Sequence, residues 1–271
     1  MKHRLDIRKY AWVKMVPNAL TLCNSLCGFA AILYMLRAYE AGIAHQQQLW
    51  IFSVSAIMIF SAMIFDAFDG FAARLLNASS IHGIQMDSLS DMVTFGVAPA
   101  TLVAIMTHCL RNWELDRPQE VLVYLLSSIY LSGAALRLAT YNVLAMQEKK
   151  SSDHFSGLPS PGAAAAICVT VFFAYDTRIE LDKLAFVLPI YAALLGLLMT
   201  SKIPYIHAGK WIQSMRRHPK RLLLFLLLLL FAIVFRVPGL ALVVTGYVLS
   251  GPVAALISLF RRKPESPAPE N

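Results

Sequence analysis

Long apolar stretches separated by short polar segments dominate the sequence. A helix needs about 20 mostly apolar residues to cross the hydrocarbon core of a bilayer, so each long stretch predicts a span. We predict eight spans, at residues 15–36, 49–74, 88–109, 120–146, 162–175, 184–201, 222–236 and 238–260. The last two are separated by little more than Arg236-Val237-Pro238, which suggests a helical hairpin with a tight turn. The pattern therefore predicts an all-α polytopic membrane protein.

Basic residues are distributed unevenly over the connecting segments. If the N-terminus is cytoplasmic, eighteen of the 24 lysines and arginines fall on the cytoplasmic side and six on the other side. Cytoplasmic loops carry an excess of Lys and Arg, so we expect both termini to face the cytoplasm. This orientation also places the segment between the second and third spans at the cytoplasmic face, together with residues 137–161 and 202–221.

The composition supports a membrane protein and argues against other classes. Of the 271 residues, 58% are hydrophobic and 15% are charged, whereas a soluble domain has roughly 25% charged residues. The net charge of +8 fits basic loops beside anionic membrane lipids, and we expect no nucleic-acid partner. The four cysteines lie in or beside apolar stretches without a histidine cluster. Packing is therefore a better interpretation of them than zinc ligation or disulfides.

Changes of composition divide the chain into five segments. Residues 1–14 form a basic segment that we expect in the cytoplasm, and the apolar run that follows is long enough to be a retained span rather than a signal peptide. Residues 15–205 contain the motifs described below, 206–221 form a basic loop, and 222–260 form the predicted hairpin. The tail, 261–271, is rich in proline and polar residues and is predicted to be disordered.

Four aspartates lie at the junctions of two very apolar stretches, where a carboxylate is costly. Asp66 and Asp69 are three residues apart, and Asp87 and Asp91 are four apart, so each pair projects from one face of a helix. The segment between the pairs is long enough for the chain to turn back and bring them face to face. Four converging carboxylates repel one another unless cations neutralise them, and carboxylate oxygens are preferred ligands of hard cations such as Mg²⁺.

The residues around the aspartates suit a phosphate ligand. Gly70 and Ala73 keep the helix surface shallow, Arg74 offers a planar fork to phosphate, and Gly83 lies one turn before Asp87 on the same face. Two divalent cations about 3.5–4 Å apart can stabilise the attacking and leaving oxygens at one phosphorus atom. We therefore predict a two-metal diphosphate site at the membrane surface. Solvated helix ends and packing glycines explain so long a pattern less well.

The motif between Asp66 and Asp91 reads D-x2-D-G-x2-A-R-x8-G-x3-D-x3-D. It resembles the signature of the CDP-alcohol phosphatidyltransferases at all eight positions. The resemblance implies an integral membrane enzyme, usually a homodimer, with a six-helix catalytic core. Such an enzyme displaces CMP from a CDP-linked lipid or alcohol with two divalent cations, Mg²⁺ or Mn²⁺. By this resemblance Asp66, Asp69 and Asp87 bind metal, and Asp91 both contacts metal and acts as the base.

Further stretches are similar to the membrane-integral bacterial phosphatidylserine synthases. They read PNALTLCNSLCGF at 17–29, MVTFGVAPA at 92–100, RLATYNV at 137–143 and FSGLPSPGAAA at 155–165. A further stretch, SKIPY at 201–205, is more weakly similar. Thr140-Tyr141 departs from the Arg-Phe pair expected of that group, and residues beyond about 206 match only as two apolar spans. The resemblance implies transfer of the phosphatidyl group from CDP-diacylglycerol to L-serine. It also implies a bacterial inner membrane, with the active site facing the cytoplasm.

The resemblance also assigns residues to the substrates. The candidates for CDP-diacylglycerol are Gly70, Ala73, Arg74, Gly83, Asn18 and Thr21. The candidates for serine are Arg137, Tyr141, Asn142 and Ser160. Asn18 and Thr21 could equally cap or back-bond the first span, and Arg137 could equally be a basic residue that snorkels to the membrane surface. Lys202 could contact the lipid phosphate, although a lipid-facing basic surface is the simpler interpretation.

Two other functions stay open at this point. Choline or glycerol 3-phosphate could be the acceptor alcohol at the same metal site. A cation-coupled transporter would also carry acids and glycines within its spans. Against a transporter, the sequence lacks paired interrupted spans in two similar halves, and its acids gather at one face.

Overall fold

The fold comes from a computed structural model that describes residues 2–40, 44–76, 81–111, 116–146, 155–177, 181–205 and 219–261. The segment 206–218 and the tail 262–271, predicted as a basic loop and a disordered end, lie outside the described residues. The elements in chain order are α1 (Lys2–Met35), η1 (Leu36–Tyr39), α2 (His45–Leu75), α3 (Ile81–Asp91), η2 (Met92–Val97), α4 (Ala98–Leu110), α5 (Arg117–Met146), β1 (Phe155–Ser156), α6 (Ser160–Thr177), α7 (Leu181–Thr200), β2 (Pro204–Tyr205), α9 (Pro219–Val234) and α10 (Arg236–Arg261). The all-α prediction is confirmed, with one short antiparallel ribbon of β1 and β2 added to it.

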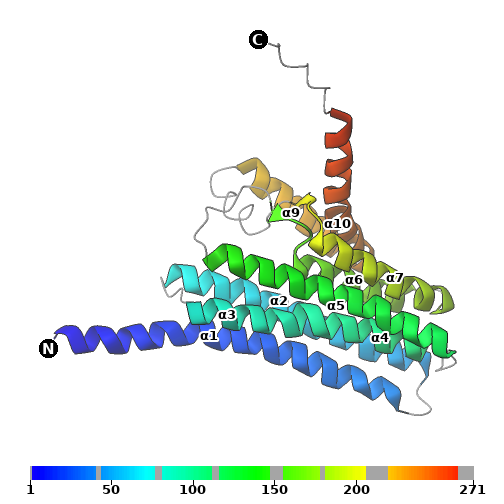
Figure 1. Ribbon diagram of the computed structural model, residues 1–271, viewed down its shortest axis with the longest axis horizontal. Coiled ribbons are helices and arrows are strands. Elements are labelled where there is room, and N and C mark those ends of the chain that lie inside the picture. Colours follow the sequence, from blue (N-terminus) through cyan, green and yellow to red (C-terminus); the bar gives the residue numbers. More distant parts are fainter. Residues whose placement is uncertain are drawn as a thin grey trace, which may run out of the picture.

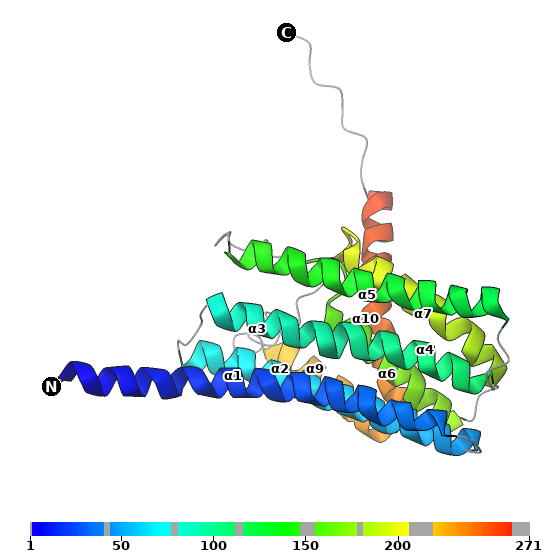
Figure 2. The same ribbon diagram turned by 60° about the horizontal axis from the view of Figure 1, so that its bottom comes forward.

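The helices α1 to α7 run alongside one another as a bundle (Figures 1 and 2). The elements α3, η2 and α4 follow one another without a break, so the bundle contains six helical rods. Helix α1 packs on α2, α5 on α7, and α2 on α6. This arrangement agrees with the six-helix core that the sequence resemblance implies.

Helices α5 and α7 touch through their backbones. A Cβ atom at Gly196 would lie 2.7 Å from the Tyr130 Cα and 2.7 Å from the Ile129 carbonyl oxygen, and Gly133 faces Gly196 in the same way. Small residues allow such close approach, which is a common basis of helix association inside membranes. The shape of the bundle therefore depends on glycine at this crossing.

Among the described residues, six helices are long and apolar enough to cross a membrane. Their ranges are Met15–Tyr39, His45–Ala73, Ile81–Leu110, Arg117–Val143, Lys183–Thr200 and Arg236–Ile257. The fifth and seventh predicted spans correspond to α6 and α9, which are 18 and 16 residues long and fall outside this set. By length and composition, the described part of the chain therefore supports six spans rather than the eight that were predicted.

The last helix takes a different direction from the bundle. Helix α10 stands steeply across the long axis of the bundle in both views (Figures 1 and 2). It packs against α9, as the predicted hairpin requires, and the turn between them places Arg236 at φ 48°. This left-handed conformation is unusual for a residue with a side chain, and it occurs at the first residue of α10, two residues after the end of α9. The eighth predicted span is thus a helix, but one that does not run alongside the others.

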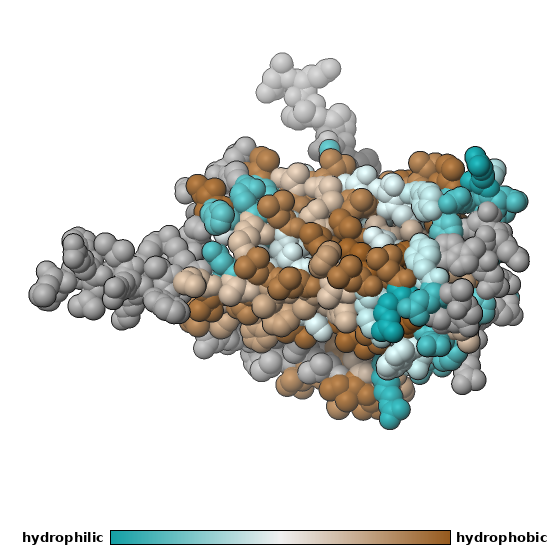
Figure 3. Space-filling model, turned by 90° about the horizontal axis from the view of Figure 1, so that it is seen from below, coloured by the Kyte–Doolittle hydropathy of each residue, from teal (hydrophilic) through white to brown (hydrophobic). Residues whose placement is uncertain are grey.

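The outer surface of the bundle is apolar. On the face in Figure 3, hydrophobic residues cover the middle, and hydrophilic residues gather toward the ends. Large apolar side chains such as Leu26 (63% exposed), Leu136 (60%) and Phe186 (69%) point outward. Exposed apolar surface on this scale marks a surface that contacts lipid.

Helix α1 is longer than predicted. It begins at Lys2, so residues 2–14 continue the first span as helix and project beyond the bundle (Figure 1). Pro17 therefore lies inside a helix and not at its first turn. From Pro17 onward the buried residues of α1 and of η1, which continues it, recur at intervals of four and three: Pro17, Thr21, Asn24, Gly28, Ala31, Met35 and Ala38. This seam of mostly small or polar residues packs on α2, α3 and η2.

Candidate active site

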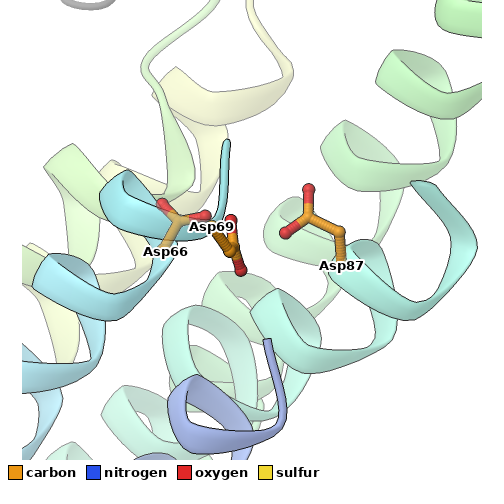
Figure 4. A group of neighbouring side chains, drawn as sticks. All are labelled: Asp66, Asp69 and Asp87. Atoms are coloured by element: carbon orange, nitrogen blue, oxygen red, sulfur yellow. The ribbon is translucent and has the colours of Figure 1, made fainter. Parts of the chain in front are cut away.

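Three of the four aspartates come together as the sequence predicts. Asp66 and Asp69 lie near the end of α2, and Asp87 lies on α3 and faces them across a gap (Figure 4). One carboxylate oxygen from each residue lies within 4.8 Å of the others. At this distance two ionised carboxylates repel by about 3 to 4 kcal/mol at an effective dielectric constant of 20. The arrangement therefore needs either protonation of some of the carboxylates or a compensating positive charge.

The carboxylates also have oxygens that the protein does not satisfy. Asp69 is 4% exposed. Its Oδ2 and the Oδ1 of Asp87 are buried, without a hydrogen-bond partner among the residues that the structure describes. An unpaired buried acceptor is costly unless a ligand completes it. A donor set made only of carboxylate oxygens suits a hard divalent cation such as Mg²⁺ or Mn²⁺.

Asp91 lies one turn after Asp87 and has a protein partner of its own. The Asn24 side-chain amide donates a hydrogen bond of 3.1 Å to Asp91 Oδ1, and the Asp91 carboxylate interacts electrostatically with the other three aspartates. Asp91 is therefore next to the three-carboxylate cluster, with one oxygen held by α1.

Asn24 is a site residue that the sequence analysis missed. It is fully buried, and its Oδ1 has no hydrogen-bond partner among the described residues, so the amide presents an unsatisfied oxygen close to the acids. The signal was present in the sequence, since Pro17, Thr21, Asn24 and Gly28 follow the four-and-three spacing of one helix face.

Hydrogen bonds hold α1 against the helix that carries Asp87 and Asp91. Ser90 donates to the Thr21 carbonyl at 2.8 Å, and Thr94 donates to the Asn24 carbonyl at 3.1 Å. The contact is close, because a Cβ at Gly28 would lie 2.8 Å from the Thr94 Cα. The position of Asn24 is therefore set by the fit between Gly28 and Thr94.

A π-helical segment, η2, begins directly after Asp91. Single wide turns of this kind often occur at functional sites. Pro99 has no N–H to offer the carbonyl four residues back, that of Phe95, and the buried Tyr130 hydroxyl donates to this carbonyl at 2.9 Å. Sequence reasoning missed the irregularity, although Pro99 within an apolar helix was a signal for it.

Four of the six residues assigned to CDP-diacylglycerol lie between Asp69 and Asp87 in the sequence, and the other two lie on α1. Gly70 and Ala73 follow Asp69 on α2, and Gly83 lies one turn before Asp87 on α3. Thr21 is 5% exposed and interacts with the Asp69 carboxylate, while its hydroxyl donates to the Pro17 carbonyl at 3.0 Å. Asn18 is half-buried one turn earlier on α1. The side chain of Arg74 lies outside what the structure describes.

The residues assigned to serine lie on the second half of α5 and at the start of α6. Arg137 is 8% exposed, and its Nη1 donates to the Met199 carbonyl at 3.4 Å. The buried position favours a packed or binding side chain over one that snorkels to the membrane surface. Gly157, at φ 85°, packs on the same carbonyl group, so Arg137 lies beside the turn that leads to Ser160, which is buried at the start of α6. The structure thus brings Arg137 and the turn together.

Asn142 and Tyr141 occupy the last turns of α5. Ser88, next to Asp87, donates to Asn142 Oδ1 at 2.7 Å, which links the end of α5 to the helix that carries the acids. Tyr141 is 43% exposed and interacts electrostatically with Arg137. Lys202 is exposed beyond the end of α7, and no described contact joins it to the aspartates.

Comparisons with known proteins point to one family. The family model described as CDP-alcohol phosphatidyltransferase matches residues 14–249. The chain is 36% identical over 171 residues to the CDP-diacylglycerol–serine O-phosphatidyltransferase of Saccharomyces cerevisiae, a match that covers 59% of this chain and 56% of the yeast protein. It is 31% identical over 195 residues to the protein of the same name from Bacillus subtilis, covering 72% and 92%. The archaetidylserine synthase of Methanothermobacter thermautotrophicus is 29% identical over 192 residues, covering 70% and 69%.

Proposed function

Because the chain belongs to the CDP-alcohol phosphatidyltransferase family, we propose that it transfers the phosphatidyl group of CDP-diacylglycerol to the hydroxyl of L-serine and releases CMP. The observation that carries the proposal is the convergence of Asp66, Asp69 and Asp87 within the signature motif. Serine as acceptor is supported by the relatives, since all three names given above contain serine.

Asp66, Asp69 and Asp87 would hold the divalent cations, with Asp91 as a further contact. When bound, Mg²⁺ or Mn²⁺ would neutralise the carboxylates and stabilise negative charge on phosphate oxygens. The unpaired oxygens of Asp69 and Asp87 support this assignment. Gly70, Ala73, Arg74, Gly83, Asn18 and Thr21 would line the CDP-diacylglycerol site.

Asp91 is the proposed general base. A serine hydroxyl is a weak nucleophile near neutral pH, so it needs a positioned group to take its proton. Asp91 would accept that proton, and the serine oxygen would form a bond to the phosphorus that carries the diacylglycerol. The bond from this phosphorus to the CMP oxygen would break. The hydrogen bond from Asn24 to Asp91 Oδ1 supports the assignment, because it fixes the carboxylate and leaves Oδ2 for the proton.

Arg137, Tyr141, Asn142 and Ser160 would form the serine pocket. Arg137 suits the serine carboxylate because guanidinium binds carboxylate with two parallel hydrogen bonds. Its burial beside the turn at Gly157 supports a binding role over a surface role. Lys202 would contact the lipid phosphate near the membrane surface.

The membrane setting follows from the same reasoning. We propose that the enzyme is a homodimer of a bacterial inner membrane, with both termini and the active site on the cytoplasmic side. The excess of Lys and Arg in the segments that would be cytoplasmic supports this orientation. A headgroup reaction at the ends of α2 and α5 suits a lipid whose acyl chains stay in the bilayer.

Purified protein in lipid nanodiscs tests the proposal directly. CDP-diacylglycerol would be supplied with L-serine, choline or glycerol 3-phosphate in separate reactions, each with Mg²⁺ or Mn²⁺, and CMP release would be followed. We expect release with serine and either or both metals. CMP release with choline or glycerol 3-phosphate, but not with serine, would show that the acceptor is that alcohol and not serine. Cation flux in liposomes without any CMP release would favour a transporter.

A further inference from the structure

Two serines on α3, the helix that carries two of the four aspartates, reach different neighbours. Ser88 and Ser90 are two residues apart, so their side chains project about 200° apart around the helix. Ser90 donates a hydrogen bond of 2.8 Å to the Thr21 carbonyl of α1. Ser88 donates one of 2.7 Å to the side chain of Asn142 on α5. Hydrogen bonds therefore hold α3 to α1 on one side and to α5 on the other.

The contact with α5 has the length expected when a hydroxyl donates to an amide oxygen. Its 2.7 Å is the usual length of an O–H···O hydrogen bond, whereas N–H···O bonds are usually about 2.9–3.0 Å long. Ser88 therefore faces Asn142 Oδ1 rather than the amide nitrogen. Both side chains are half-buried, and partial shelter from water strengthens such a bond.

The bond leaves the nitrogen of the Asn142 amide for a ligand. This nitrogen carries two N–H donors, and no hydrogen bond to another described residue occupies them. N–H donors bind oxygen acceptors such as the carboxylate of serine. Without Ser88 the amide would keep its donors, but the side chain could rotate among several rotamers. An amide that is held in advance loses less conformational entropy when it binds a ligand.

The same bond places the amide beside the acids. Ser88 directly follows Asp87 in the chain, and Asp87 faces Asp66 and Asp69 across the gap in Figure 4. An acceptor that binds to the Asn142 amide is therefore held close to the cluster that would hold the cations. Transfer requires the acceptor oxygen and the phosphorus to meet at this place in a fixed orientation.

Resting on the assignment of Asn142 to the acceptor site, we propose that Ser88 is a positioning residue for Asn142. Its hydroxyl holds the Asn142 amide with the N–H groups available to an oxygen of the acceptor, and it ties the end of α5 to the helix that carries the acids. The signature motif gives no indication of this role, because Ser88 occupies one of its unspecified positions between Asp87 and Asp91.

The test compares Ser88→Ala, which removes the hydroxyl, with Ser61→Ala as a matched control. Ser61 lies on α2, and its hydroxyl donates to the Ile57 carbonyl of the same helix at 2.9 Å. In nanodiscs with CDP-diacylglycerol and L-serine, we expect Ser88→Ala to raise the KM for serine about five- to tenfold, which corresponds to about 1–1.4 kcal/mol. The KM for CDP-diacylglycerol, kcat and the Mg²⁺ concentration for half-maximal activity should stay within about twofold. Ser61→Ala should change none of these values.

A double-mutant cycle with Asn142→Ala tests whether Ser88 acts through Asn142. Asn142→Ala alone should raise the KM for serine at least as much as Ser88→Ala does, and the double variant should show no further rise. Multiplicative effects would overturn the proposal, and so would an unchanged KM for serine in either single variant or an equal rise in both KM values. Those results would leave serine transfer by the unmodified protein intact. Failure of the proposed function would appear separately, as an unmodified protein that does not use serine.

Discussion

Replacement of Gly28 by alanine tests whether the fit of α1 against η2 controls the active site. The added Cβ would lie 2.6 Å from Thr94 Oγ1 and 2.8 Å from Thr94 Cα. The hydroxyl could rotate away, but the backbone carbon cannot. Carbon atoms pack at about 3.5–4.0 Å, so the two helices must separate by about 1 Å.

This displacement would also disturb Asp91, the proposed base. Asn24 lies one turn before Gly28 and donates to Asp91 at 3.1 Å, so a shift of about 1 Å would lengthen the hydrogen bond beyond its usual range. A misplacement of this size can reduce a rate by about 100-fold. We therefore expect Gly28→Ala to lower kcat by about 10- to 100-fold, and overpacking to cost about 1–3 kcal/mol of stability.

The assay measures kcat from CMP release at saturating CDP-diacylglycerol and serine, and Tm in the same nanodisc preparation. Gly246→Ala is the control, because a Cβ at Gly246 would meet nothing within 4 Å. It should keep kcat and Tm. If Gly28→Ala kept kcat within about twofold, a loss of less than about 0.5 kcal/mol of transition-state stabilisation, the reasoning about the α1–η2 contact would be refuted.

Three further predictions concern the site itself. Asp91→Asn should lower kcat by about 10²- to 10⁴-fold while CDP-diacylglycerol still binds; normal turnover in the CMP assay would reject Asp91 as the base. Asn24→Ala should lower kcat by about tenfold, which corresponds to about 1.4 kcal/mol, because Asp91 loses its hydrogen bond. Neither KM should change much. A selective rise in one KM would instead place Asn24 in a substrate pocket. Chelation with EDTA should abolish CMP release, and Mg²⁺ or Mn²⁺ should restore it; activity that persists in EDTA would argue against the metal site.

The acid cluster could be predicted from the sequence because it depends on the spacing of aspartates that are close together in the chain. Asp66 and Asp69 share one helix face, Asp87 and Asp91 share another, and the cost of carboxylates near a membrane leaves few arrangements for them. The helices were predictable for the same reason, since apolar length alone determines whether a stretch can span.

Other features depend on tertiary contacts that no local pattern encodes. The direction of α10 follows from a left-handed residue, Arg236, in a hairpin whose sequence reads simply as two apolar spans. The role of Asn24 depends on which face of α1 turns inward. The close contact between Gly28 and Thr94 identifies that face. The π-helical segment appears where Pro99 leaves a carbonyl for Tyr130, a partner 35 residues away.

The seam of α1 predicts how this helix tolerates change. Its outer rows present side chains such as Leu22, Leu26 and Phe29 to lipid, where any apolar residue of similar size serves equally well. Its inner row, from Pro17 to Ala38, is made mostly of small and polar residues whose volumes and hydrogen bonds are specific. A saturation scan of α1 should therefore show intolerant positions at alternating intervals of four and three. The most hydrophobic positions of this helix should be the ones most freely exchanged, which is the reverse of the rule for a helix on the surface of a soluble protein.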